Sequence, residues 1–197
     1  MALVVAAQTF ATALVKLKSG AGFVAGICAL SAAVLRDRGR KALFALSLFP
    51  LLLASPSNAV SNHVRITKLS DVAFGTLANL GVDAVQAQSV CLYADTATNG
   101  YNVTATGTGS GGAFELNATP GTMAYVVQWN SSAGQSSGTQ LVPNVPLTGQ
   151  VTSATQQTCN SGPATSASLI VTLQSTALSS ATAGTYNGTL TLLIGPE

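Results

Sequence analysis

The residues that most often carry catalytic chemistry are few in this sequence and lie far apart. The single histidine is His63. Acidic side chains that could act with it in general acid–base catalysis stand singly, at Asp71, Asp83, Asp95 and Glu115. No pair of them has the spacing of a recognised catalytic motif, and the many serines and threonines lack a base arranged to activate a hydroxyl group. We therefore predict that the chain is not an enzyme and that it uses no cofactor.

Two other patterns could suggest a bound group, and neither fits. Residues 107–112 read GTGSGG, but a phosphate-binding loop also needs a lysine and a following helix. We interpret these residues as a hairpin loop. One histidine and two distant cysteines in the body of the chain do not have the ligand spacing of a zinc site, so we predict no metal.

Residues 36–59 have the three parts of a secretory signal peptide. A basic cluster, RDRGRK at residues 36–41, precedes an apolar run at residues 42–54, and small residues stand at Ser57 and Ala59. The apolar run is shorter than the ~20 residues that span a bilayer, which argues against a membrane anchor. We predict cleavage after Ala59 and export of the remaining chain.

Residues 1–35 precede this signal, and two interpretations of them are open. Either the true translation start lies near Val34 or Leu35, or the leader is extended and contains a second apolar stretch at residues 23–35. We favour the first. In both cases residues 1–59 are left out of the predicted fold, and residues 60–197 are expected to form one domain with one core.

The formal net charge of +2 belongs to the leader rather than to the predicted mature chain. Six of the eight basic residues precede position 42, and Arg65 and Lys68 are the two that follow it. Five acidic residues follow position 60, so residues 60–197 carry a formal charge of −3. Because this region has no basic patch, nucleic-acid binding has no electrostatic basis.

The two cysteines of the predicted mature chain are interpreted as one disulfide. Cys28 would be lost with the leader, whereas Cys91 and Cys159 both lie beside predicted strands. In an exported chain such a pair is most simply a disulfide, and two free buried thiols are the alternative. The bond would stabilise the fold by roughly 4 kcal/mol, because it closes a long loop.

Apolar and polar residues alternate through residues 60–197, which is the pattern of half-buried strands. It predicts about seven to nine short strands without a long helix, and therefore an all-β sandwich. The first strand is expected to bend at Ser70-Asp71, and two prolines limit residues 141–151 to an edge strand or an irregular strand. The alternation also points Trp129 inward, which makes it a core residue rather than an exposed platform for a sugar.

The last fifteen residues contain the clearest strand. Its apolar face is formed by Tyr186, Leu190, Leu192 and Ile194, and Gly195-Pro196 is expected to end it. A strand this apolar must lie in a sheet, where an open edge beside it would invite another strand. The alternative is an ordinary last strand of a complete domain.

The order of several motifs resembles the spore coat protein U family, the subunits of archaic chaperone–usher pili. In chain order the motifs are DVAFG at residues 71–75, VCLY at 90–93, GYNV at 100–103, FEL at 114–116, MAYVVQW at 123–129, CN at 159–160 and AGTYNGTLTL at 183–192. The likeness covers residues 62–196, and the last motif is its most specific part.

The resemblance implies an immunoglobulin-like sandwich of about seven strands that is incomplete, because its final strand is missing. In this family a periplasmic chaperone first supplies that strand, and a neighbouring pilin subunit later supplies it at an outer-membrane usher, by donor-strand complementation. By this likeness the donor-strand groove would be lined by Val64, Ile66, Phe74, Tyr186, Leu190, Leu192 and Ile194. The implied function is a structural or adhesive subunit of a bacterial surface pilus, exported through the periplasm to the fimbrium for adhesion or biofilm formation.

The resemblance has one departure that affects the expected role. A subunit that donates a strand needs an alternating segment before its first strand, but here only residues 60–62 precede His63. We therefore expect the chain to accept a donor strand and to give none, as a terminal subunit would. The alternative to pilus assembly is a self-contained secreted β-sandwich, either a binding module or a spore- or cell-coat protein.

Overall fold

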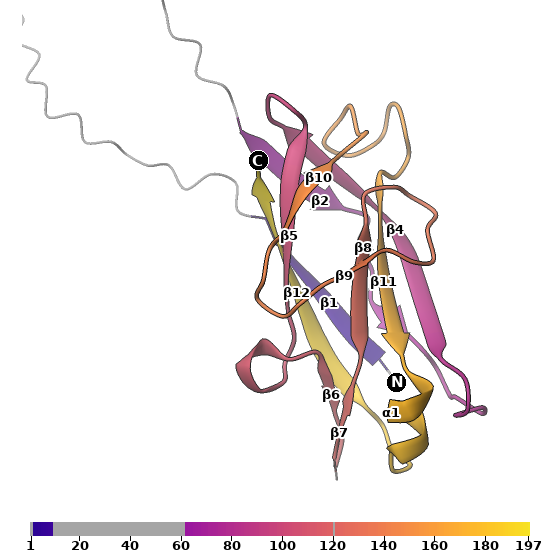
Figure 1. Ribbon diagram of the computed structural model, residues 1–197. Coiled ribbons are helices and arrows are strands. Elements are labelled where there is room, and N and C mark those ends of the chain that lie inside the picture. The colour runs from indigo at the N-terminus through magenta and orange to yellow at the C-terminus, as the bar shows by residue number, and fades with distance from the viewer. Residues whose placement is uncertain (1, 10–61, 120) are drawn as a thin grey trace, which may run out of the picture. The chain divides into compact units, whose positions relative to one another are not determined.

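The computed structural model describes residues 2–9, 62–119 and 121–197, and strands are the main elements of this part of the chain (Figure 1). Two short helical elements join them, η1 (Ser110–Gly112) and α1 (Ser175–Ser180). The predicted all-β fold is therefore confirmed. The predicted signal peptide at residues 36–59 lies outside the described residues.

The strands form two sheets that pack face to face. The first sheet contains, in spatial order, β10 (Leu147–Val151), β5 (Gly100–Thr106), β12 (Asn187–Pro196), β1 (Ala2–Thr9) and β3 (Val72–Ala73), and it also includes β6 (Glu115–Asn117) and β7 (Thr122–Ala124). The second contains β2 (His63–Thr67), β4 (Ala84–Asp95), β11 (Ala167–Leu173), β8 (Val126–Asn130) and β9 (Thr139–Gln140). Neighbouring strands are antiparallel, except that β1 runs parallel to β12.

The core lies between the two sheets. Every second residue of a strand points to the inner face of its sheet, and these inward residues are apolar. Leu92 of β4 and Leu169 of β11 come from the second sheet, and Val103 of β5 and Leu192 of β12 come from the first. All four have no exposed surface and belong to one hydrophobic cluster. The period-two alternation in the sequence therefore becomes one inward face on each sheet.

Trp129 is a core residue, as its place in the alternation predicted. It is 1% exposed, and its indole Nε1 donates a hydrogen bond of 3.0 Å to the Tyr101 hydroxyl, which lies on the other sheet. Their rings meet edge to face, with centroids 6.4 Å apart. Burial raises the pKa of Tyr101 to about 12. The indole is therefore enclosed with its N–H satisfied, and it offers no surface to a ligand.

The first strand of the body passes from one sheet to the other at the predicted bend. β2 pairs with β4 in the second sheet, and β3 pairs with β1 in the first. Between them Lys68 has a φ of 62°, in the left-handed region. The Gln88 side chain accepts a hydrogen bond of 2.9 Å from the Ser70 backbone N–H and so holds the bend. Because the chain crosses between the sheets here, Phe74, which follows β3, lies at the edge of the first sheet although β2 belongs to the second.

Two features of the fold differ from the sequence-based expectations or were missed by them. β12 continues through Gly195-Pro196 instead of ending there, and Pro196 pairs with Tyr101 as the last residue of the strand. A proline is tolerated at such an end because the ladder does not need its missing N–H. The short helix α1 was also not predicted. Residues 141–151 agree with the expectation of an edge or irregular strand, since residues 141–146 form no strand and β10 pairs with β5 alone among the described strands.

Residues 1–59 were left out of the predicted fold, but one of their segments is paired in the structure of the whole chain. Ala2–Thr9 forms β1, which lies between β12 and β3 in the first sheet. The segment reads ALVVAAQT and contains no charged residue, so its composition is compatible with a strand inside a sheet. The signal-peptide pattern places this segment before the expected mature chain, which is why it was not part of the predicted fold.

Candidate functional site at the edge of the last strand

The strand β12 has one fully apolar face, and the sandwich buries that face completely. Leu190, Leu192 and Ile194 have no exposed surface, whereas the alternate residues Thr191 and Leu193 are half-buried. Burying a leucine or isoleucine side chain contributes roughly 1.5–3 kcal/mol each. The last strand is therefore a central strand of the first sheet, and it contributes much of the core on that side.

The two edges of β12 are paired by very different parts of the chain. On one edge it pairs antiparallel with β5, from Thr191 opposite Thr106 to Pro196 opposite Tyr101. On the other edge it pairs parallel with β1, from Ala2 opposite Asn187 to Thr9 opposite Ile194 (Figure 1). We call the place between β12 and β3 the β1 position. Among the described strands, none from residues 62–197 occupies it.

The seven residues that the resemblance assigned to a donor-strand groove all belong to the same hydrophobic cluster. Each is at most 8% exposed in this structure. They come from three places: β2 supplies two, the residue after β3 supplies one, and β12 with the residue before it supplies four, namely Val64, Ile66, Phe74, Tyr186, Leu190, Leu192 and Ile194. The fold thus brings them together, and their role in binding a donor strand stays a prediction.

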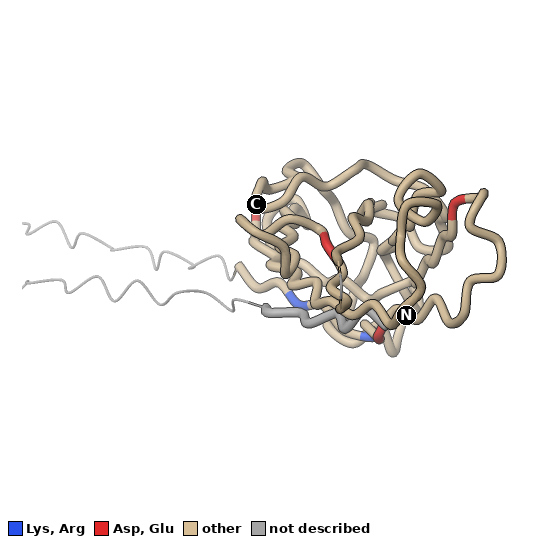
Figure 2. Tube along the Cα trace, turned by 90° about the horizontal axis from the view of Figure 1, so that it is seen from below, with Lys and Arg blue, Asp and Glu red and all other residues tan. Residues whose placement is uncertain are grey.

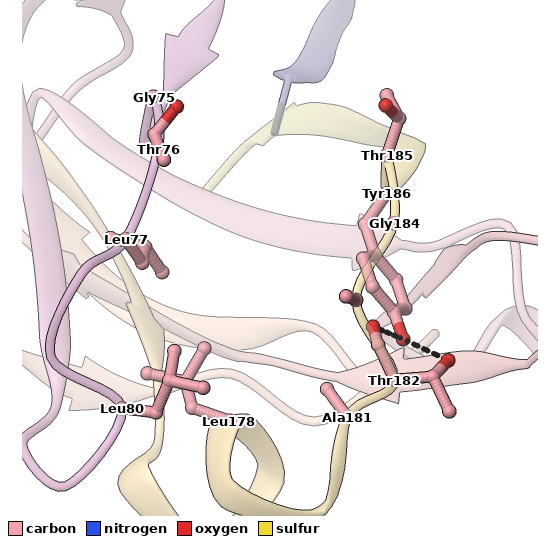
Figure 3. Close-up of a pocket in the computed structure, with 11 residues that line it drawn as sticks. Gly75, Thr76, Leu77, Leu80, Leu178, Ala181, Thr182, Gly184, Thr185 and Tyr186 are labelled. Atoms are coloured by element: carbon pink, nitrogen blue, oxygen red, sulfur yellow. Dashed lines mark hydrogen bonds between the residues drawn. The ribbon is translucent and has the colours of Figure 1, made fainter.

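A pocket of about 470 Å³ lies just beyond the N-terminal end of β1. One wall is the segment after β3, and the other is the segment that leads from α1 into β12. The lining comprises residues 75–77, Leu80, Leu178 and residues 181–186. Figure 3 shows Leu77, Leu80 and Leu178 on one side of the pocket and Tyr186 on the other. None of the lining residues is charged, and both leucine and threonine residues line the pocket.

Local contacts hold the two walls of this pocket in place. The Tyr186 hydroxyl donates a hydrogen bond of 3.0 Å to the Thr182 carbonyl, which fixes the turn before β12 (Figure 3). On the other side of α1, the Asp83 carboxylate accepts a hydrogen bond of 2.7 Å from the Ser175 backbone N–H at the start of the helix. This bond lowers the pKa of Asp83 below its usual value. The pocket is therefore part of the ordered sandwich.

The disulfide predicted from the sequence is present on the second sheet. Cys91 of β4 and Cys159 of the segment between β10 and β11 are bonded, with their Cα atoms 5.9 Å apart. The Lys68 ammonium group donates hydrogen bonds to the carbonyls of Cys159, at 3.4 Å, and of Ala164, at 2.7 Å. The segment that carries Cys159 is thus tied to β4 and also to the bend after β2.

Within the part of the chain that the structure describes, the residue types that bind metals or catalyse reactions do not form a cluster. In the described ranges, no group of three or more histidine, cysteine or acidic side chains could hold a metal ion. Figure 2 shows the few charged residues of these ranges scattered along the chain. No helix among the described residues is long and apolar enough to cross a bilayer. The edge of β12 is therefore the feature that we take as the candidate site.

Comparison of the chain with protein-family models, with curated proteins and with solved structures returned no match.

Proposed function

We propose that the chain is a structural or adhesive subunit of a bacterial surface pilus, of the spore coat protein U type, which receives a strand from a partner at the β1 position. The observation that carries the proposal is the pairing of β12. Ala2–Thr9 pairs with its second edge. Among the described strands, none from residues 62–197 pairs there. If signal peptidase cleaves after Ala59, the exported chain loses β1 and keeps the two strands on either side of it, β12 and β3.

An open β1 position would make the exported chain prone to pair with a strand of another molecule. The edge of β12 would present a row of unpaired backbone groups, and such an edge templates the addition of another strand. The strand that carries this edge is also strongly apolar, since its residues Leu190, Leu192 and Ile194 are fully buried in the sandwich. Backbone hydrogen bonds would supply affinity for an added strand, and the pocket at the Tyr186 end would take an apolar side chain.

By this proposal the partners are a periplasmic chaperone, an outer-membrane usher and neighbouring pilin subunits, and the protein reaches the cell surface as part of a fimbrium. The experiment is periplasmic expression of residues 60–197 with and without a co-expressed periplasmic pilus chaperone. We expect rapid degradation or aggregation alone, and a soluble one-to-one complex with the chaperone. A variant that carries Leu193→Ala at the half-buried position is the control, since it should still be captured.

The second candidate function is a self-contained secreted β-sandwich. The observation that favours it is that the sheet is closed at β12 when β1 is present. If residues 60–197 accumulate as a stable monomer without a chaperone, and the β12 amides are protected from hydrogen exchange, the pilus proposal is refuted and this candidate replaces it.

A further inference from the structure

One stretch of the second sheet has an edge with which no described strand pairs. β2 pairs with β4 only from Cys91 to Asp95, because the chain then crosses to the first sheet. On its other side, β4 pairs with β11 from Ala84 to Val90. Residues 84–90 of β4 therefore lie at an edge of the second sheet, among the strands that the structure describes (Figure 1). We call this stretch the β4 edge.

The hydrogen bonds of β4 show which backbone groups face its open side. In a strand, the N–H and C=O of one residue point to the same side, and those of the next residue point to the other. The Val90 carbonyl accepts a hydrogen bond of 2.8 Å from the backbone N–H of Ser166, directly before β11. Even-numbered residues of the β4 edge therefore face β11. The odd-numbered residues Val85, Ala87 and Ser89 present their N–H and C=O groups to the open side.

The segment that crosses between the sheets leaves space beside the β4 edge. A pocket of about 260 Å³ lies between residues 70–73 and residues 86–88. The Gln88 side chain bridges the two segments, and it donates a hydrogen bond of 2.9 Å to the Ser70 carbonyl. This contact uses a side chain and not the backbone groups of the odd-numbered residues. Ala87 is exposed and Val85 is 46% exposed, so another strand has access to the edge.

Other edges of the described sheets have features that hinder the addition of a strand. β2 carries Arg65, and a charged side chain opposes pairing with a second chain. β10 has a register shift between Leu147 and Gln150, and β3, β7 and β9 have three residues or fewer. By contrast, β4 is regular along its edge, and no charged residue lies between Asp83 and Asp95 in the sequence. The β4 edge thus lacks the usual protection against pairing.

The β4 edge is also complementary to itself. It reads AVQAQSV, which is nearly the same in both directions. When two copies run antiparallel with Ala87 opposite the partner's Ala87, Gln86 faces the partner's Gln88. Val85 then faces the partner's Ser89, and a twofold axis repeats both pairs. Each opposed pair of odd-numbered residues exchanges two backbone hydrogen bonds, about six in all.

We propose that two copies of the chain associate through their β4 edges, antiparallel, with Ala87 beside the twofold axis. The second sheets of the two copies then form one continuous sheet. Because a contact of this length is small, the dimer is weak and reversible. The contact lies in the second sheet, so it does not depend on the β1 position or on the proposed pilus function. If the chain is a fibre subunit, the same contact would join subunits of neighbouring fibres.

The first test is disulfide cross-linking of the full chain, with Cys28→Ser in every variant to remove a competing thiol. Ala87→Cys places two thiols at opposed positions, where the Cα atoms are about 5.5 Å apart, a distance that a disulfide spans. Val85→Cys is the matched control, because it lies on the same face but its two copies would be about 14 Å apart. On mild oxidation we expect a covalent dimer of Ala87→Cys and little dimer of Val85→Cys.

The second test is sedimentation equilibrium of the full chain without cross-linking. Ala87→Lys places two like charges opposite each other, and we expect the Kd of the dimer to rise at least about tenfold. Its circular dichroism spectrum should be unchanged, because the side chain is exposed. Val151→Lys adds the same charge at a site on β10 that is 53% exposed, and it should leave the Kd unchanged.

The inference is overturned if Val85→Cys cross-links as efficiently as Ala87→Cys, or if Ala87→Lys sediments as the native chain does. A native chain that stays monomeric up to about 1 mM also overturns it. Chaperone capture of residues 60–197 tests the pilus proposal separately. A dimer that forms as described while no chaperone captures the chain would leave this contact in place and refute the pilus function.

Discussion

Replacing Tyr101 by phenylalanine should reduce the free energy of unfolding by about 2 kcal/mol. The substitution keeps the ring, which meets Trp129 edge to face, and removes only the hydroxyl that accepts the indole hydrogen bond at 3.0 Å. Trp129 is 1% exposed and Tyr101 has no exposed surface, so water does not replace the lost acceptor. A buried donor left without a partner costs about 1–3 kcal/mol.

The measurement is urea-induced unfolding of the full chain, followed by circular dichroism and by tryptophan fluorescence. Trp129 is the single tryptophan, so its emission reports on this part of the core alone. A loss of about 2 kcal/mol corresponds to a decrease in Tm of about 4–8 °C for a protein of this size. The emission of the folded variant should stay that of a buried indole, because the surrounding side chains are unchanged.

A double-mutant cycle with Trp129→Phe isolates the hydrogen bond from the loss of packing. The two substitutions together should cost less than the sum of the single effects, by about 1 kcal/mol or more, since the groups share one interaction. Tyr186→Phe is the matched control: its hydroxyl donates a hydrogen bond to the Thr182 carbonyl, and this bond is only partly buried, so the loss should be smaller. If Tyr101→Phe changes the unfolding free energy no more than Tyr186→Phe, the core role assigned to the pair is refuted.

Three further predictions follow from single features of the fold. Reduction of the Cys91–Cys159 disulfide, whose cysteines are 68 positions apart, should lower the unfolding free energy by roughly 4 kcal/mol in denaturant titrations. Leu192→Ala, at a fully buried site on β12, should lower it by about 2–5 kcal/mol in the same assay. Asp83 contributes stability above its usual pKa of 3.8, because its hydrogen bond to Ser175 lowers the folded-state pKa. That contribution should disappear as the pH falls through the lowered pKa, and Asp83→Asn should remove this part of the pH dependence.

Each of these predictions has its own control. Reductant should have no further effect on a variant with both cysteines replaced by alanine, and an unchanged unfolding curve on reduction of the native protein would contradict the first prediction. Leu193→Ala removes the same atoms at a half-buried site, so equal losses at Leu192 and Leu193 would contradict the second. For Asp83, the test is acid titration of stability, and identical pH curves for the native chain and the variant would contradict the third.

Much of the fold follows from local pattern. Period-two alternation places residues such as Leu169 and Trp129 on one face of a strand, and apolar side chains on that face must leave water, so the all-β class and much of the core could be predicted. The disulfide could be predicted because two cysteines remain after the leader is set aside. The bend at Ser70-Asp71 could be predicted because the alternation is interrupted there.

The neighbours of β12 could not be predicted, and the physical reason is general. Alternation says which face of a strand is buried, but the hydrogen-bonding edges are backbone and carry almost no sequence signal. Only the three-dimensional arrangement decided that β5 covers one edge and that Ala2–Thr9, a segment set aside as leader, covers the other. The apolar face of the last strand is thus a property of residues 186–194, whereas its pairing, on which the candidate site depends, is a property of distant segments meeting in one sheet.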